Sequence, residues 1–244
     1  MKIFSLALML WLFSAEILSA ERYTFGVVPQ FAPSKLHEIW YPILKELEQR
    51  TGYQLQMVGT TNIPAFEEGF ISGEYDFAYM NPYHATVAMS KKGYRTLVRD
   101  QGRRLSGILV VRKESPLQKV SQLQGKRVAF PAPNALGASL LMRADIDQLY
   151  QTKIDPIYVQ THSSVYLHVL MGNTDAGGGV LATLRRQPQE IQDQLKIIYR
   201  TREMAPHPIM VHPRVSSTVA EAVQQALLEM GNSVEGAKLL ARIP

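Results

Sequence analysis

Cysteine is absent from this chain of 244 residues. Without it the protein has no disulfide framework, no thiolate metal site and no cysteine nucleophile. It also has no cysteine that could carry a lipid after an export leader. We therefore expect the mature protein to be free in its compartment and not lipid-anchored.

Signatures of catalysis are absent as well. The chain has no Gly-x-Ser-x-Gly elbow, no His-Glu-x-x-His pair and no Walker loop. His162 and His168 are six residues apart, which places them on different faces of a helix and excludes a metal pair there. The neighbouring carboxylates Glu67 and Glu68 are typical of a solvated helix surface. We expect no enzyme, no metal and no cofactor, while an enzyme on the same scaffold stays a weaker alternative.

Charged residues are few, at 19% of the chain against 46% hydrophobic residues, as in soluble globular proteins. The formal net charge is +5, and it stays +5 when residues 1–20 are removed, because Lys2 and Glu16 cancel. No basic stretch is interleaved with aromatic residues, so we expect no nucleic-acid partner. The small positive excess is compatible with an anionic ligand.

The first twenty residues differ from the rest. Lys2 precedes an apolar run over residues 3–13, and a more polar segment ends with Leu-Ser-Ala at Ala20. This pattern is typical of a secretory signal peptide and is too short to span a membrane. We predict cleavage after Ala20 and a periplasmic location. An uncleaved anchor is less favoured because the apolar run breaks early.

The remaining chain alternates strands with helices, which predicts an α/β fold with mostly parallel sheets. Strands are expected at 23–28, 53–58, 76–80, 94–98, 106–112, 128–130, 157–159, 196–199 and 209–211. Extended segments at 106–112 and 203–211 indicate that the chain leaves a first lobe and later returns to it. We expect residues 21–112 and 203–244 to form lobe 1, and residues 113–202 to form lobe 2.

Four polar loops each open a helix, at 60–64, 79–83, 131–137 and 161–164. Ligands of open α/β sheets bind beyond the carboxyl ends of the strands, and helix starts present free N–H groups to anions. Asn134 is a good N-cap candidate, and Gly137 keeps the first helical turn small. The four loops are expected to converge on a cleft between the lobes.

Four segments in this order carry a family resemblance. They are Phe-Gly-Val-Val-Pro at 25–29, Glu68-Gly69 leading to the strand at Asp76, Pro133-Asn134, and Thr161-His162-Ser163 followed by Asp175-Ala176-Gly177. Over residues 23–240 the chain resembles the PhnD-like family of periplasmic phosphate/phosphite/phosphonate-binding proteins of ABC importers. The resemblance implies a type II, two-lobed periplasmic binding protein that acts as a monomer. It also implies a small anionic or zwitterionic ligand and a membrane permease as partner. A membrane sensor kinase is the alternative partner, and the sequence does not separate the two.

The chain departs from this family at the ligand site. A Ser-Thr-Ser run that grips phosphonate oxygens is replaced by Ala135, Leu136 and Gly137, so that Ser139 is the nearest hydroxyl. A family tyrosine aligns with Ile63. These changes remove hydrogen-bond donors, and we expect tight phosphonate binding to be lost.

The expected ligand contacts combine helix starts with one imidazole. His162 matches the family's histidine and is expected to be the chief side-chain donor, although a histidine at this place is often only a capping residue. Gly177 is expected either to let backbone approach the ligand or to lie in a flexible turn. The full set is Tyr79, Asn81, Asn134, Ala135, Leu136, Gly137, Ser139, His162 and Gly177.

Overall fold

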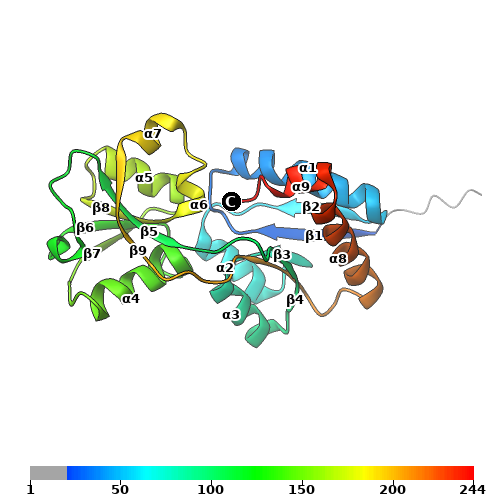
Figure 1. Ribbon diagram of the computed structural model, residues 1–244. Helices are drawn as coiled ribbons and strands as arrows, with labels where there is room; N and C mark the ends of the chain where they lie inside the picture. Colours follow the sequence, from blue (N-terminus) through cyan, green and yellow to red (C-terminus); the bar gives the residue numbers. More distant parts are fainter. Residues whose placement is uncertain (1–20) are drawn as a thin grey trace, which may run out of the picture.

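The computed structural model describes residues 21–244, which form two α/β lobes side by side (Figure 1). The predicted signal peptide lies outside the described residues. Among the helices of residues 21–244, none combines the length and the apolar character needed to cross a membrane.

Lobe 1 is built on a five-stranded sheet in the order β2-β1-β3-β10-β4. Its strands are β1 (Arg22–Val27), β2 (Gln54–Val58), β3 (Phe77–Tyr79), β4 (Arg95–Arg99) and β10 (Pro208–Val211). Its helices are α1 (Pro33–Thr51), α2 (Ile63–Ser72), α3 (Pro82–Lys92), α8 (Ser217–Asn232) and α9 (Val234–Leu240). Strand β1 runs parallel to β2 and β3, whereas β10 is antiparallel to both of its neighbours. The chain therefore returns to this sheet after building the second lobe.

Helix α1 shows how the sequence pattern produces this lobe. Apolar residues at helical spacing form one stripe, and all of them are buried: Leu36, Ile39, Trp40, Ile43, Leu44 and Leu47. Trp40 packs between Phe25 and Tyr79, with ring centroids 5.3 and 4.9 Å away. Gly52 ends the helix in the left-handed region, at φ 77°. The stripe thus fixes α1 on the sheet, as the spacing predicts.

Lobe 2 contains a second five-stranded sheet in the order β7-β6-β8-β5-β9. Its strands are β5 (Gly107–Arg112), β6 (Arg127–Phe130), β7 (Asp155–Tyr158), β8 (Ala176–Val180) and β9 (Leu195–Arg200). Its helical elements are the 3₁₀ turn η1 (Val120–Leu123), the π-turn η2 (Leu136–Leu140), α4 (Leu141–Gln148), α5 (His162–Leu170), α6 (Leu181–Leu184) and α7 (Gln189–Asp193). Two sheets in two lobes confirm the predicted fold class. The expectation of mostly parallel sheets is wrong, because β10 and β5 each run antiparallel to both of their neighbours.

The expected lobe boundary at residue 112 is wrong. Strand β5 pairs antiparallel with β8 and β9, so it lies inside the second sheet. Residues 107–111 are all buried, because an apolar run without alternation fits a strand covered on both faces. The two sheets divide between Arg99, where β4 ends, and Gly107.

The glycine run is a strand and not a flexible turn. Gly177, Gly178 and Gly179 form the middle of β8, which pairs parallel to β6 and antiparallel to β5. A Cβ on Gly178 would lie 2.2 Å from the carbonyl oxygen of Ala138, and a Cβ on Gly179 would lie 2.3 Å from the Tyr166 hydroxyl. Glycine is needed here because η2 and α5 pack directly on the strand backbone.

Two extended segments connect the lobes, and they are bonded to each other. The N–H of Leu105 donates to the carbonyl oxygen of Met204, and the N–H of Met204 donates back, both at 2.9 Å. In Figure 1 the green segment between β4 and β5 and the brown segment between β9 and β10 run from one lobe to the other. A paired two-segment hinge of this kind permits the lobes to rotate about the crossing.

Candidate functional site

A cavity of about 10 Å³ lies between the lobes, at the place where the polar loops were expected to converge. Lobe 1 and the hinge contribute Val28, Gln30, Ile63, Asn81, Leu105 and His207, and lobe 2 contributes Ala135, Leu136, Gly137, Ala138, His162 and Val180. Such a volume holds about one water molecule, so an oxyanion fits between the lobes only when they are slightly further apart than in this structure. None of these lining residues is Lys, Arg, Asp or Glu, so ordinary ion pairs do not form the site.

The lobes are closed on each other around this cavity. The apolar core of lobe 1 continues across the cleft to Ala135, Ala138 and Val180. One polar bridge runs beside it, in which the Asn134 side-chain amide donates to Glu67 Oε2 at 3.0 Å. The Asn81 amide in turn donates to the carbonyl oxygen of Asn134 at 3.2 Å. The structure therefore represents a closed cleft.

Helix α3 begins at this closed cleft. Asn81 caps it, with its side-chain oxygen accepting from the N–H of His84 at 2.9 Å. His84 is fully buried, and its Nε2 lies 2.9 Å from Glu67 Oε1. Since Glu67 also holds Asn134, the carboxylate joins the start of α3 to the facing loop of lobe 2.

The second helix start comes from lobe 2, and here the predicted cap is wrong. Ala135, not Asn134, is the N-cap residue, and it makes no side-chain cap bond. The Asn134 side chain is instead used in the bridge to Glu67. The helix opens with the π-turn η2, whose first residues Leu136 and Gly137 line the cavity. Their N–H groups precede the first hydrogen-bonded turn, as anion binding at a helix start requires.

Gly137 is held at the cavity wall by close packing against Gly107, the first residue of β5. A Cβ on Gly107 would lie 2.1 Å from the carbonyl oxygen of Gly137, so the two backbones are in direct contact. A Cβ on Gly137 would lie 3.3 Å from a Val180 methyl and 3.5 Å from Leu105. A side chain at position 137 would therefore crowd Val180 of β8, while its contact with Leu105 would be an ordinary one.

The third helix start carries His162, the first residue of α5. Thr161 caps this helix by accepting from the N–H of Ser164 at 3.1 Å. The N–H of His162 donates across the cleft to the carbonyl oxygen of Gln30 at 3.2 Å. The imidazole is 4% exposed, and its Nδ1 has no hydrogen-bond partner among the described residues. Burial alone lowers the pKa of His162 to about 4, so the ring is neutral at pH 7.

Two polar cavity residues were not predicted, Gln30 and His207. Gln30 follows β1 and Pro29, and no sequence signal marks it. His207 lies between two prolines just before β10, and its ring stacks on Tyr79 at 5.2 Å. Burial, with a smaller effect of the neighbouring histidines His84 and His162, lowers its pKa. The Pro-His-Pro sequence was the available signal. It places a histidine between two rigid residues at the point where the chain returns from lobe 2 to lobe 1.

Five of the nine predicted ligand residues line the cavity: Asn81, Ala135, Leu136, Gly137 and His162. Asn134 lies beside it in the bridge. Ser139 is buried, and its hydroxyl accepts from Arg143 Nε at 3.1 Å. Gly177 lies in the sheet, where a Cβ would meet Val165 at 2.5 Å. These two positions face the interior of lobe 2 and not the cleft.

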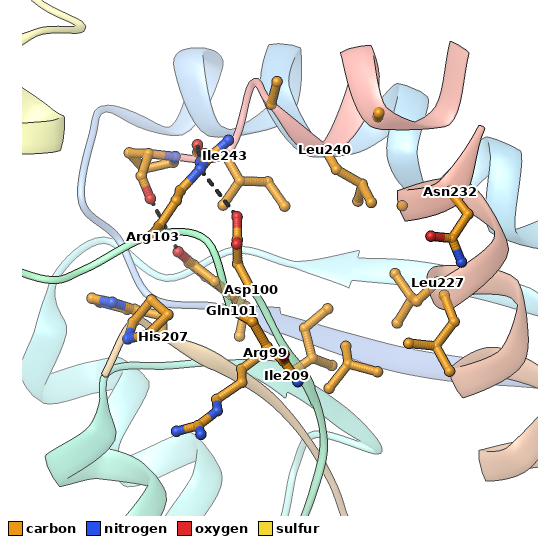
Figure 2. Close-up of a pocket in the computed structure, with 18 residues that line it drawn as sticks. Arg99, Asp100, Gln101, Arg103, His207, Ile209, Leu227, Asn232, Leu240 and Ile243 are labelled. Carbon is orange, nitrogen blue, oxygen red and sulfur yellow. Dashed lines mark hydrogen bonds and ion pairs between the residues drawn. The ribbon is translucent and has the colours of Figure 1, made fainter. Parts of the chain in front are cut away.

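Tyr79 also lies outside the small cavity. It lines a larger one of about 510 Å³ within lobe 1, together with His207, which borders both cavities. Figure 2 shows the larger cavity with Leu227 and Asn232 on one side and Arg103 and His207 on the other. Arg103 is paired with Asp100 at 3.1 Å and donates to the carbonyl oxygen of Ile243. The aromatic residue that ends β3 therefore serves the core and this second cavity.

Comparison with known proteins identifies a family and solved structures that this chain resembles. The family model described as "ABC transporter, phosphonate, periplasmic substrate-binding protein" matches residues 25–244. The phosphate-import protein PhnD of Mycolicibacterium smegmatis is 25% identical over 174 residues, which are 64% of this chain. The match spans about half of that relative, 54% of its length.

Two solved structures share the fold. A binding protein component of an ABC phosphonate transporter from Pseudomonas aeruginosa superposes with a TM-score of 0.77 at 18% identity, over 92% of this chain and 79% of that one. PhnD1 from Prochlorococcus marinus, solved with methylphosphonate, superposes with a TM-score of 0.81 at 14% identity, over 91% and 89% of the two chains. At these identities the likeness establishes the two-lobed fold alone.

Proposed function

This chain belongs to the family of periplasmic substrate-binding proteins of ABC phosphonate transporters, and we propose that it binds a small oxyanion between its lobes for delivery to a membrane permease. The predicted family resemblance is thereby confirmed. The ligand and the partner of this particular chain are our proposals.

The observation that carries the proposal is the meeting of three helix starts at one closed interlobe cavity. The starts of α3, η2 and α5 bring Asn81, Leu136 and His162 to its wall. Each start presents the positive end of a helix dipole to negative charge, and at η2 the N–H groups of Leu136 and Gly137 precede the first hydrogen-bonded turn. No Asp or Glu lines the cavity, so no acidic side chain in its wall repels an anion.

The wall also argues for a ligand other than a simple phosphonate. Ala135, Leu136 and Gly137 offer no hydroxyl, and Ile63 adds a further apolar surface. A neutral hydrogen bond contributes about 0.5–1.5 kcal/mol, so two or three missing hydroxyls weaken binding by roughly one to three powers of ten. We infer a preference for an oxyanion that needs fewer hydrogen-bond donors or is partly apolar, and only weak binding of alkylphosphonates.

A thermal-shift screen of oxyanions, followed by calorimetry on the hits, tests this function. The panel is phosphate, phosphite, sulfate, methylphosphonate and small organic phosphonates with apolar groups. At least one member should raise the melting temperature and bind with a stoichiometry of one. Nanomolar binding of methylphosphonate would refute the change of specificity, and the absence of any hit would refute the function.

We further propose export to the periplasm with removal of residues 1–20, and an ABC permease as the partner. Intact mass of periplasmic material should begin at Glu21, and material that retains Met1 would contradict export with cleavage. Crosslinking in cells should capture the permease. The alternative of a sensor-kinase partner stays a prediction, and capture of a kinase instead would favour it.

A further inference from the structure

Three polar side chains from the two lobes and the hinge line the small cavity: Gln30, His162 and His207. His162 is 4% exposed, and its Nδ1 has no hydrogen-bond partner within residues 21–244. Gln30 is 3% exposed, and His207 is partly buried. Buried polar groups are nearly always paired, so the unpaired Nδ1 of His162, beside two further polar side chains, points to a polar ligand in this cavity.

The two imidazoles approach the cavity from opposite sides of the cleft. His162 begins α5 in lobe 2, whereas His207 precedes β10, where the chain re-enters lobe 1. Closing the lobes therefore brings both rings to one cavity, and opening them separates the rings. A ligand bonded to both histidines is held only in the closed state.

The charged groups around these rings are already engaged. From α2, Glu67 is bonded to His84 of α3 and to Asn134. From α4, Arg143 donates to Ser139 and to the carbonyl oxygen of Pro133. Beyond the ring of Tyr79, Arg103 and Asp100 are paired with each other. None of the residues that line the small cavity is Asp, Glu, Lys or Arg, so no charged side chain in its wall pairs with either imidazole.

We propose that His162 and His207 clamp the oxyanion from the two lobes and that the cleft takes up one proton from solvent when the anion binds. This inference rests on the proposed function, and it assigns to His207 a ligand contact. No covalent bond forms or breaks. The proton binds an imidazole nitrogen, which then donates to the anion while the second, neutral ring donates its own N–H.

The physical reason is a change in what surrounds the rings. In the empty cleft burial without a partner keeps both histidines neutral. An anion within hydrogen-bond distance favours the charged imidazole, so the complex holds a proton that the free protein does not. Two imidazoles alone are fewer than the three protein ligands of a usual zinc site, and residues 21–244 contain no cluster of three or more suitable side chains. An oxyanion therefore fits the site better than a metal ion.

The coupling makes affinity depend on pH. For sulfate, which stays fully ionised over the working range, one bound proton makes affinity rise by up to about tenfold for each unit that the pH falls. This rise in affinity is expected at pH values between the histidine pKa of the free protein, which is lower, and that of the complex. Phosphate and methylphosphonate show the same uptake after correction for their own titration.

The experiment is calorimetry of the EDTA-treated mature protein with sulfate, phosphate and methylphosphonate. Titrations at pH 7 in buffers of different ionisation enthalpy give the number of protons taken up. The wild type should take up close to one proton per anion bound. His162→Asn and His207→Asn should each weaken binding at least tenfold and reduce the uptake, whereas the exposed His37→Asn on α1 should change neither.

A second measurement uses the wild type alone, so it does not depend on whether the variants fold. Histidine ring NMR of the wild type should show one buried imidazole that becomes protonated when the anion is added. Binding without proton uptake, or uptake that persists in both variants, would overturn the inference and leave the proposed function intact. Failure of every anion to bind would overturn both.

Discussion

Returning hydroxyls to the start of η2 should restore binding of a simple phosphonate. The change is Ala135→Ser together with Leu136→Thr, because both side chains line the interlobe cavity. Two new neutral donors at about 0.5–1.5 kcal/mol each give roughly 1–3 kcal/mol, or about 5- to 150-fold in affinity for methylphosphonate. Threonine is also smaller than leucine, so the closed cavity of about 10 Å³ gains room for the ligand.

Position 137 should behave differently from its two neighbours. A Cβ on Gly137 would lie 3.3 Å from a Val180 methyl, which must shift slightly, whereas Leu105 at 3.5 Å would be in ordinary van der Waals contact. Because of the crowding at Val180, the triple variant with Gly137→Ser should gain less affinity than the double variant.

The assay is calorimetry with methylphosphonate at constant pH and salt, with circular dichroism to establish that each variant is folded. Leu140→Thr is the matched control, since Leu140 lies in the same π-turn but does not line the cavity. It should leave the affinity unchanged. A folded double variant with wild-type affinity for methylphosphonate would refute the argument that the missing hydroxyls set the specificity.

Three further predictions concern stability and closure. Since burial lowers the pKa of His162 to about 4 in the fold, the unfolded chain binds a proton below pH 6.5 that the fold does not, and stability should fall with pH toward 4. The loss from this histidine is about 2 kcal/mol at pH 5, and urea unfolding of His162→Asn at pH 7 and 5 should show a correspondingly smaller loss than the wild type. Asn134→Ala removes the hydrogen bond to Glu67 that joins the lobes. Loss of about 1.5 kcal/mol from the closed state should weaken anion binding roughly tenfold. Unchanged affinity by calorimetry would contradict this prediction. Gly178→Ala places a Cβ 2.2 Å from the carbonyl oxygen of Ala138 and should lower the free energy of unfolding in urea by more than about 2 kcal/mol. The control Gly59→Ala, whose Cβ would have no atom within 4 Å, should leave the stability unchanged. Equal stability of the two variants would show that the close packing of β8 is not needed.

Local signals in the sequence were sufficient for most of the fold. The apolar stripe of α1 and the side-chain caps at Asn81 and Thr161 all follow from local chemistry. Each of these depends only on neighbours within one or two helical turns. The alternation of such elements then indicates an α/β chain without any knowledge of distant contacts.

The errors occurred where distant contacts decide the structure. Asn134 has the chemistry of an N-cap, but Glu67 of the other lobe competes for its side chain. The glycines of β8 resemble a turn until the packing of η2 and α5 on that strand is known. His207 reaches the cleft because β10 returns to the first sheet. The extended segment at 203–211 indicated that return, but no local pattern specifies which of its side chains faces the cavity.

Locating a bound oxyanion tests the central claim most directly. Crystals of the mature protein soaked with arsenate, a phosphate analogue with a strong anomalous signal, would place the anion without reference to any assumed ligand. We predict one principal anomalous peak between the lobes, within hydrogen-bond distance of the backbone N–H of Leu136 or Gly137 and of the imidazoles of His162 and His207. A peak only in the larger cavity of lobe 1, or no peak between the lobes, would contradict the account.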